Sequence, residues 1–337
     1  MFHDARQPGE VEFDRALRPT SLAEFVGQDR VRENLRVAVE AARAREEPLD
    51  HVIFAGPPGL GKTTLAHLIA GAMGTQITVT SGPALASPKD VAGTLTRQER
   101  GDILFIDEIH RLPRTVEEYL YTAMEDHAID VVLDSSGPSS RSVRLSLAPF
   151  TLVGATTREG LLSGPLRSRF GLVERLVTYP NSDICAILDR AAGLLGTPID
   201  AAAAELLATR SRGIPRMALR LQRRIRDLAQ VQGMDHIDVP TVHDGLERLG
   251  IDALGLEETD RKVLHALITR GEPTGLKTLA AMVDEAEDTI EDVFEPHLIR
   301  CGLIARTPRG RVATDAAYDH LGMDRPAPKE NDGTLPF

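Results

Sequence analysis

Short apolar runs alternate with helical segments in the first half of the chain. Residues 51–55 (HVIFA), 102–106 (DILFI) and 151–155 (TLVGA) have the length and composition of buried strands. Residues 62–73, which follow the first run after a glycine-rich turn, carry apolar side chains at helical spacing. Strands that alternate with helices predict an α/β fold, in which a parallel sheet is covered by helices on both faces. Polar residues follow each run, so the pattern predicts a functional site at the carboxyl edge of the sheet.

The residues between the second and third strands have a different pattern. Residues 129–133 (IDVVL) and 142–147 (SVRLSL) have β character, and residues 134–140 (DSSGPSS) between them are typical of a turn. The pattern predicts a β-hairpin at 129–147 that projects from the sheet. Exposed isoleucine and valine on such a hairpin would invite a partner protein. An ordinary surface hairpin accounts equally well for the pattern.

The pattern becomes helical after residue 180. Apolar residues recur at helical spacing in the segments 183–195, 201–210, 215–232 and 239–249. They predict a small helical lid. Short helices followed by two strands then give the order of a winged helix, at 261–269, 276–283, 289–300, 303–306 and 311–314. The patterns together predict a large domain at 1–180, the lid at 181–252, the winged helix at 253–322 and a disordered tail at 323–337.

Composition limits the class of protein. The chain of 337 residues exceeds one ordinary domain, and its 2 cysteines exclude a disulfide framework or a cysteine-based zinc site. No apolar run approaches the length of a bilayer span, and residues 1–18 do not resemble a secretory signal. We therefore expect a cytoplasmic protein with no membrane contact.

The charge balance bears on nucleic-acid binding. A net charge of −11 argues against a protein coated in nucleic acid. Attraction to phosphate depends on local patches, however, and arginines gather in two stretches that contain no acid. The first stretch is somewhat better explained as a solvated helix face. The two sets are Arg210, Arg212, Arg216, Arg220, Arg223, Arg224 and Arg226, and then Arg300, Arg306, Arg309 and Arg311.

The turn after the first strand has the sequence GPPGLGKT at residues 56–63. Its position between a strand and a helix makes this phosphate-binding motif a strong signal. Gly59 and Gly61 allow backbone N–H groups to turn toward a triphosphate, and the helix N-terminus adds its positive end. Lys62 supplies a positive charge for the β- and γ-phosphates. The Thr63 hydroxyl is placed to bind Mg²⁺, so the motif predicts an ATP site.

Carboxylates follow the second strand in the sequence LFIDE. We expect Asp107 at the strand tip to hold the Mg²⁺ shell and Glu108 beside it to orient or deprotonate water. The presence of Glu108 favours hydrolysis of ATP over binding alone. His110 follows closely, but a single histidine here is more often structural, and we assign it no catalytic role.

Two arginines are candidates for sensing the γ-phosphate. Arg169, in the sequence GPLRSRF, lies beyond the third strand, where a side chain can leave its own subunit. A guanidinium that reaches a γ-phosphate stabilises transition-state charge by a factor on the order of a thousand or more. Arg167 competes with Arg169 for this role. Arg216, in the sequence GIPR, opens a lid helix and could approach the nucleotide from the other side.

The motifs together resemble the RuvB family, the bacterial AAA+ motors that drive branch migration of Holliday junctions. The resemblance runs from residue 17 to residue 322. Few AAA+ proteins combine these motifs with the arginine-rich wing at 306–314. The motifs that carry the resemblance are GPPGLGKTT at 56–64, TSGPAL at 80–85, LFIDEIHRL at 104–112, GATTR at 154–158, PLRSRFG at 165–171 and RTPRGRVAT at 306–314.

The resemblance implies a role for further residues at the nucleotide. Thr157, with Thr156 beside it, matches the first sensor, and Arg216 matches the second. Arg169 matches the finger that acts on a neighbouring subunit's ATP. The family usually has an aromatic residue where His127 stands, which weakens the inference of a contact there. The other residues that match nucleotide-binding positions are Leu17, Arg18, Gly59, Lys62, Thr63, Thr64, Glu125, Asp126, His127 and Tyr179.

The resemblance also implies partners. It predicts a homohexameric ring around double-stranded DNA at Holliday junctions, acting in recombination and repair. The hairpin at 129–147 corresponds to the arm that docks on a RuvA-like junction-binding protein, and a RuvC-like resolvase is a further expected partner. Arg306 and Arg311 match positions that contact the DNA backbone, with Arg309 between them. Glu287 replaces a residue that is basic in many relatives, so we expect the arginine wing to carry more of the binding.

Two other functions fit part of the sequence. A clamp-loader-like AAA+ switch shares the sheet, the lid and the arginine finger, but it would lack the wing at 306–314. A winged-helix regulator with a passive nucleotide site would not need Glu108 or Arg169, since both serve turnover. A DNA-translocating ATPase accounts for all of these features.

Overall fold

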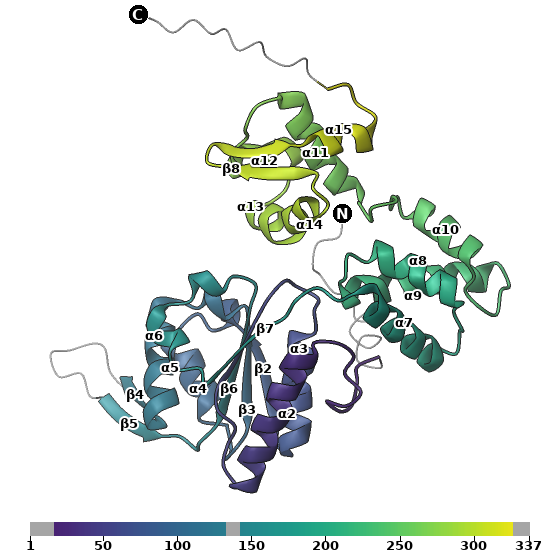
Figure 1. The fold of residues 1–337 in the computed structure, drawn as a ribbon. Coiled ribbons are helices and arrows are strands. Elements are labelled where there is room, and N and C mark those ends of the chain that lie inside the picture. The colour runs from purple at the N-terminus through teal and green to yellow at the C-terminus, as the bar shows by residue number, and fades with distance from the viewer. Residues whose placement is uncertain (1–16, 133–141, 326–337) are drawn as a thin grey trace, which may run out of the picture.

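The structure, a computed structural model, describes residues 17–132 and 142–325. The expected hairpin turn at 134–140 and residues 326–337 of the expected tail lie outside the described residues. Figure 1 shows the chain passing from an α/β part through a group of helices to a second mixed part. None of the helices within the described ranges has the length and apolar character needed to cross a membrane.

A five-stranded sheet forms the centre of the first part. Its strand order is β2-β3-β6-β1-β7, and each neighbouring pair is parallel. The strands are β1 (Val52–Ala55), β2 (Ile77–Ser81), β3 (Ile103–Asp107), β6 (Thr151–Thr156) and β7 (Leu172–Arg175). The predictions at 51–55, 102–106 and 151–155 are confirmed as β1, β3 and β6, which are adjacent at the sheet centre. We did not predict β2 and β7, the two edge strands.

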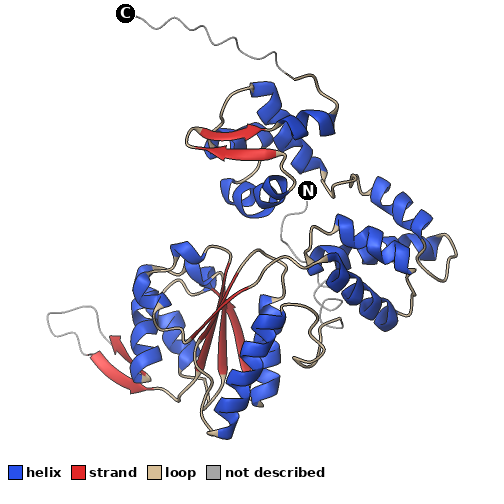
Figure 2. Ribbon diagram, viewed as in Figure 1, coloured by secondary structure: helices blue, strands red, loops and turns tan. Residues whose placement is uncertain are grey.

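Helices cover both faces of this sheet, as the α/β pattern predicts (Figure 2). Side chains alternate across β1, so that Val52 and Phe54 join one buried cluster and Ile53 joins the other. The helices α2 (Asp29–Ala44) and α3 (Lys62–Met73) pack in the first cluster. The second contains α4 (Pro88–Leu95) and α5 (Arg114–Asp126), together with Leu166 of the short α6 (Gly164–Arg167).

The predicted β-hairpin is present as an antiparallel pair. Strand β4 (Ala128–Val132) pairs with β5 (Ser142–Ser146) in a register that places Ala128 opposite Ser146. Our expectation of exposed isoleucine is wrong, because Ile129 is only 1% exposed and packs in the second cluster. Val143 is 39% exposed, so the described arm offers valine rather than isoleucine to the surface.

The predicted lid is confirmed as a set of helices whose apolar faces join the first cluster. They are α7 (Asn181–Leu195), α8 (Ala201–Arg210), α9 (Pro215–Val231) and α10 (Val239–Arg248). Helix α7 ends at Leu195 and is capped by Gly196, whose left-handed conformation places its N–H within bonding distance of the Ala192 and Gly193 carbonyls. Helix α10 begins where the Asp238 side chain accepts a hydrogen bond from the Thr241 N–H.

The last part is a winged helix with its own apolar core. It contains α11 (Glu258–Arg270), α12 (Leu276–Val283), α13 (Glu287–Thr289), α14 (Glu295–Arg300), the wing strands β8 (Ile304–Thr307) and β9 (Gly310–Ala313), and α15 (Asp315–Leu321). We predicted one helix at 289–300, but a π-helical turn at Ile290–Phe294 lies between α13 and α14. Pro296 explains this turn, because its ring cannot donate a backbone hydrogen bond to the preceding turn.

Candidate nucleotide site and wing

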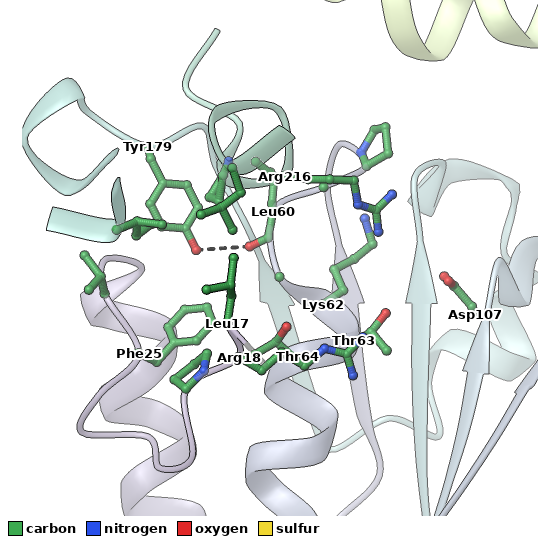
Figure 3. A pocket seen from close by; sticks show the side chains of 18 of the residues that line it. Leu17, Arg18, Phe25, Leu60, Lys62, Thr63, Thr64, Asp107, Tyr179 and Arg216 are labelled. Carbon is green, nitrogen blue, oxygen red and sulfur yellow. Dashed lines mark hydrogen bonds between the residues drawn. The ribbon is translucent and has the colours of Figure 1, made fainter. Parts of the chain in front are cut away.

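A cavity of about 430 Å³ lies where the carboxyl edge of the sheet meets the lid. It brings together most of the predicted nucleotide residues from segments that are far apart in the sequence. The predicted residues that line it are Leu17, Arg18, Gly59, Gly61, Lys62, Thr63, Thr64, Asp107, Glu108, Thr157, Tyr179 and Arg216. Figure 3 shows that the loop before α3, the lid and the N-terminal segment all contribute side chains.

The glycine-rich loop is fitted closely between β1, α3 and the lid. Gly59 has φ of 81°, and a Cβ atom there would lie 2.7 Å from Cγ2 of Ile214 in the lid. Gly56 has φ of 140°, and a Cβ atom there would lie 2.5 Å from the Leu176 carbonyl oxygen. Only glycine fits such positions without strain. The loop leads directly into the N-terminus of α3, where backbone N–H groups can bind an anion.

Lys62 is 8% exposed at the start of α3. Its Nζ donates to the carbonyl oxygens of Gly56 at 2.7 Å and Pro57 at 2.8 Å. Burial lowers the pKa of Lys62 to about 8, against a smaller raising effect of Asp107 and a further lowering by Arg216. The lysine thus lies folded against its own loop, and phosphate oxygens could replace the two carbonyl partners.

The two predicted carboxylates occupy the tip of β3 and the turn after it. Asp107 accepts a hydrogen bond from the Glu108 N–H at 3.0 Å. Glu108 adopts the left-handed conformation, with φ of 48°, which is uncommon outside glycine. Gly82 permits this turn, because a Cβ atom there would lie 2.4 Å from the Glu108 carbonyl oxygen. The Glu108 carboxylate pairs with Arg111 at 2.9 Å, a pocket residue that we did not predict.

The end of β6 links the loop, the carboxylates and the predicted first sensor. The Thr156 carbonyl accepts from Gly56 N–H at 3.1 Å. The Thr156 hydroxyl lies 2.9 Å from Nδ1 of His110 and accepts from Arg158 N–H at 3.0 Å. Burial lowers the pKa of His110. These contacts give His110 a structural place beside the site, and Thr157 itself lines the cavity.

The lid and the segment that leads into it close the other side of the cavity. The Tyr179 hydroxyl donates to the Leu60 carbonyl at 3.0 Å, the bond drawn in Figure 3, and burial raises the pKa of Tyr179. Arg216 N–H reaches the Gly59 carbonyl at 3.4 Å. The Arg216 side chain extends beside Lys62 in Figure 3. Movement of the lid would therefore change the contacts of the glycine-rich loop.

Several residues at the apolar end of the cavity could not be predicted from the sequence. Phe25, Ile187 and Leu219 line this end, and Arg190 donates to the Leu17 carbonyl at 2.7 Å. Phe25 lies on the N-terminal segment, and the others lie on lid helices. They belong to no short motif. Helical spacing alone could mark the lid residues only as core positions, so it is the fold that brings them to the nucleotide cavity.

The predicted finger lies outside this cavity. The Arg169 guanidinium pairs with Glu125 at 2.9 Å, donates to the Pro165 carbonyl at 2.7 Å and lies over the Tyr121 ring at 4.6 Å. Glu125, Asp126 and His127 are also absent from the cavity lining. Arg167 is exposed. The structure therefore separates these residues from the cavity that holds the other predicted nucleotide residues.

The predicted DNA-binding arginines differ in their surroundings. Arg309 is exposed at the wing turn. Arg306 is 52% exposed and Arg311 is 15% exposed, and both pair with Glu295, at 2.6 and 3.0 Å. The Glu295 side chain is only 1% exposed. Burial alone would raise the pKa of Glu295, but the two arginines lower it. Arg306 and Arg311 therefore also neutralise a buried acid.

The first arginine cluster is divided among several ion pairs. Arg212 is buried against Asp260 and so ties the lid to the winged helix. Arg220 pairs with Glu257 at 2.7 Å, and Arg226 pairs with Asp227 at 3.2 Å. These pairings favour the structural interpretation of the cluster over a single DNA-binding patch.

Comparison with known proteins follows the same division of the chain. Residues 17–176 match the family model described as the Holliday junction DNA helicase RuvB P-loop domain. Residues 179–252 match the RuvB AAA lid domain, and residues 253–322 match the RuvB C-terminal winged helix domain.

Relatives with curated names and solved structures are similar over nearly the whole length. The Holliday junction branch migration complex subunit RuvB of Kosmotoga olearia is 56% identical over 94% of this chain and 93% of its own. The structure of Thermotoga maritima RuvB, described as a Holliday junction branch migration motor, has a TM-score of 0.84 at 51% identity. It covers 92% of this chain and 100% of its own. The structure of a point mutant of that protein has a TM-score of 0.86, at 51% identity over 92% of this chain and 99% of its own.

Proposed function

This chain belongs to the RuvB family of Holliday junction branch migration motors, and we propose that it works as one subunit of a homohexameric ring that pumps duplex DNA. It is an ATP hydrolase and a DNA motor of the AAA+ class. The observation that carries the proposal is one cavity lined by Lys62, Asp107, Glu108 and Arg216, in a chain that also carries an arginine-bearing wing. A clamp-loader-like switch is not favoured, because all three domains match this family. We propose the domain boundaries 1–180, 181–252 and 253–322.

We propose distinct roles for the cavity residues during hydrolysis. Lys62 and the N-terminus of α3 hold the triphosphate, with Gly59, Gly61 and Thr64 shaping the loop. Once the Glu108 carboxylate has separated from Arg111, it orients the attacking water or accepts a proton from that water. Thr157 and Arg216 respond to the γ-phosphate from the sheet and the lid. The base lies at the apolar end, near residues that include Leu17, Arg18 and Tyr179, which all line the cavity.

Magnesium fits the donor atoms at the phosphate end. Thr63 and Asp107 line the same cavity and offer hydroxyl and carboxylate oxygens, the ligands that this ion uses beside waters and phosphates. The described residues contain no group of three or more histidine, cysteine or acidic side chains arranged around a metal. When bound, Mg²⁺ would neutralise phosphate charge.

Arg169 is our candidate for the finger, with Arg167 as its competitor. Arg169 lies on the face formed by the end of α5 and by α6, where Glu125, Asp126 and His127 also lie. Since none of these residues lines its own subunit's cavity, we propose that the face meets a neighbour's nucleotide. Closure of a ring then completes each ATP site.

We propose a second partner surface at the hairpin. The arm at 129–147 would bind a RuvA-like junction-binding protein, as the name of its curated relative, a branch migration complex subunit, suggests. The assembled motor at a junction would also meet a RuvC-like resolvase in the cytoplasm. Duplex DNA would contact the wing.

The rate of ATP hydrolysis tests the motor function. We expect duplex DNA, together with a purified RuvA-like protein, to raise kcat several-fold, because a motor couples turnover to its track. The measurement is steady-state phosphate release with each component added separately and together. Equal rates under all conditions would contradict the motor and favour a passive switch.

The wing predicts a salt-dependent affinity for duplex DNA. Arg309→Ala is expected to weaken binding and to lower the slope of log K against log salt by about one, because one phosphate contact is lost. Arg306→Ala and Arg311→Ala should act similarly. They are best measured in a Glu295→Gln background, because removing either arginine alone leaves a buried carboxylate with less neutralisation.

Arg270→Ala provides the matched control for this measurement. Arg270 lies in the same domain, and its partner is the exposed Glu272. Its replacement removes the same charge from a position on α11, outside the wing strands β8 and β9 and the turn between them. An unchanged salt slope in all three wing variants would redirect the search for the DNA contact to the arginines at 210–226.

A further inference from the structure

The third helical segment of the winged helix is acidic where DNA recognition helices are usually basic or polar. Carboxylates repel DNA phosphates, so this segment is poorly suited to enter a groove. Three of its acids instead contact an arginine of the ATPase domain. The acids of the segment are Glu287, Asp288, Glu291, Asp292 and Glu295.

That arginine is Arg158, which directly follows the candidate sensor Thr157. Its Nε donates to both carboxylate oxygens of Asp292, at 2.9 and 3.1 Å. Its Nη2 lies 2.9 Å from Asp288 and 3.3 Å from Glu291. The Arg158 side chain is 22% exposed, so these pairs are better shielded than ordinary surface pairs.

Asp292 also reaches the sensor itself. The Thr157 hydroxyl donates to Oδ2 of Asp292 over 3.5 Å. A threonine hydroxyl carries one hydrogen, so while it is given to Asp292 it is not available to a phosphate oxygen. Thr157 lines the nucleotide cavity, which places this competition at the ATP site.

The same acidic segment also forms ion pairs with the arginines of the wing. Glu291 lies 3.6 Å from Arg306 and 3.8 Å from Arg311, while its other oxygen faces Arg158. Glu295, one helical turn further on, pairs with both wing arginines. A continuous row of charges therefore runs from the sensor loop to the arginines that we assign to duplex DNA.

We propose that Asp292 is a positioning residue that holds the Thr157–Arg158 sensor loop in a restrained position until duplex DNA engages the wing. Phosphates compete with Glu291 and Glu295 for Arg306 and Arg311. When Glu291 and Glu295 lose their arginine partners, the acidic segment shifts. The contact between Asp292 and Thr157 then becomes weaker. The inference rests on the nucleotide and DNA sites proposed above.

The test is the steady-state kcat and KM of the full chain without DNA. Asp292→Ala is expected to raise basal kcat by about fivefold, which corresponds to a barrier lower by about 1 kcal/mol, with little change in KM. The ratio of kcat with duplex DNA to kcat without DNA should then fall toward one. Asp292→Glu, which retains the carboxylate, should restore much of the restraint. An unchanged basal kcat, or a decrease in kcat both with and without DNA, would overturn the proposal.

Two further variants separate positioning from loss of structure. Glu258→Gln removes one acid from the same domain at an exposed pair with Lys262, and it should leave basal kcat unchanged. Arg158→Ala should raise kcat as Asp292→Ala does, and the double variant should add nothing further. Additive effects would overturn the proposed contact. Failure of the motor function is recognised separately, because wild-type turnover would then not respond to duplex DNA.

Discussion

Replacing Lys62 by Ala is expected to lower kcat for ATP hydrolysis by about a hundredfold to a thousandfold. The lysine is 8% exposed and is the positive charge at the start of α3, where the cavity receives phosphate. A charge fixed in such a shielded place stabilises developing negative charge more strongly than it would in water. The measurement is phosphate release at saturating ATP, with thermal unfolding of the same sample.

Stability separates lost chemistry from lost folding in this variant. Burial lowers the pKa of Lys62 to about 8, so the folded protein keeps its charge at pH 7 at some energetic cost. Removing the ammonium group also removes that cost, and Tm should therefore stay close to the wild-type value. A large decrease in Tm would mean that the bonds to Gly56 and Pro57 are needed for folding.

The pH dependence of nucleotide affinity offers a control within the same protein. Phosphate should raise the Lys62 pKa again, so binding favours the protonated lysine. ADP affinity should be constant below the free pKa of about 8 and should fall above it, by up to about tenfold per pH unit. Lys62→Ala should bind weakly without this decline. Asp107→Asn should abolish turnover, and near-normal rates in either variant would refute the assigned roles.

The sequence predicted the sheet centre well and its edges poorly. Strands β1, β3 and β6 are buried through almost all of their length, so they appear as continuous apolar runs. Strand β2 reads ITVTS and is partly exposed, and β7 reads LVER with only Glu174 buried. Edge strands that pack on one side lack the apolar signal of the central ones. Their pairing depends on the rest of the sheet.

The candidate site shows a similar division. Phosphate and carboxylate residues were found because the chemistry requires fixed spacing along one turn. Phe25, Arg111 and Arg190 line the same cavity without any such motif. The pairing of Arg158 with Asp292 was also beyond prediction, since it joins residues 134 positions apart in two domains. Contacts of this kind depend on how domains pack, which periodicity does not describe.

Arg169→Ala is expected to lower the ATPase activity of the assembled ring by about a thousandfold, while ATP binding to each subunit persists. The reason is that the Arg169 side chain is absent from its own cavity, although it is only 20% exposed. Glu125, the Pro165 carbonyl and the Tyr121 ring hold the guanidinium on the outer face of α5 and α6. A finger fixed on that face can act only across a subunit boundary.

Mixing two inactive variants provides the decisive measurement. Arg169→Ala subunits keep an intact cavity, and Lys62→Ala subunits keep an intact finger, so a mixed ring contains some sites that have both. Activity should therefore reappear on mixing and reach a maximum at intermediate ratios. Arg167→Ala serves as the matched control, since Arg167 is exposed two residues away. If mixing restores no activity, Arg169 acts within its own subunit. If Arg167→Ala is equally inactive but regains activity on mixing with Lys62→Ala subunits, both arginines share the finger role.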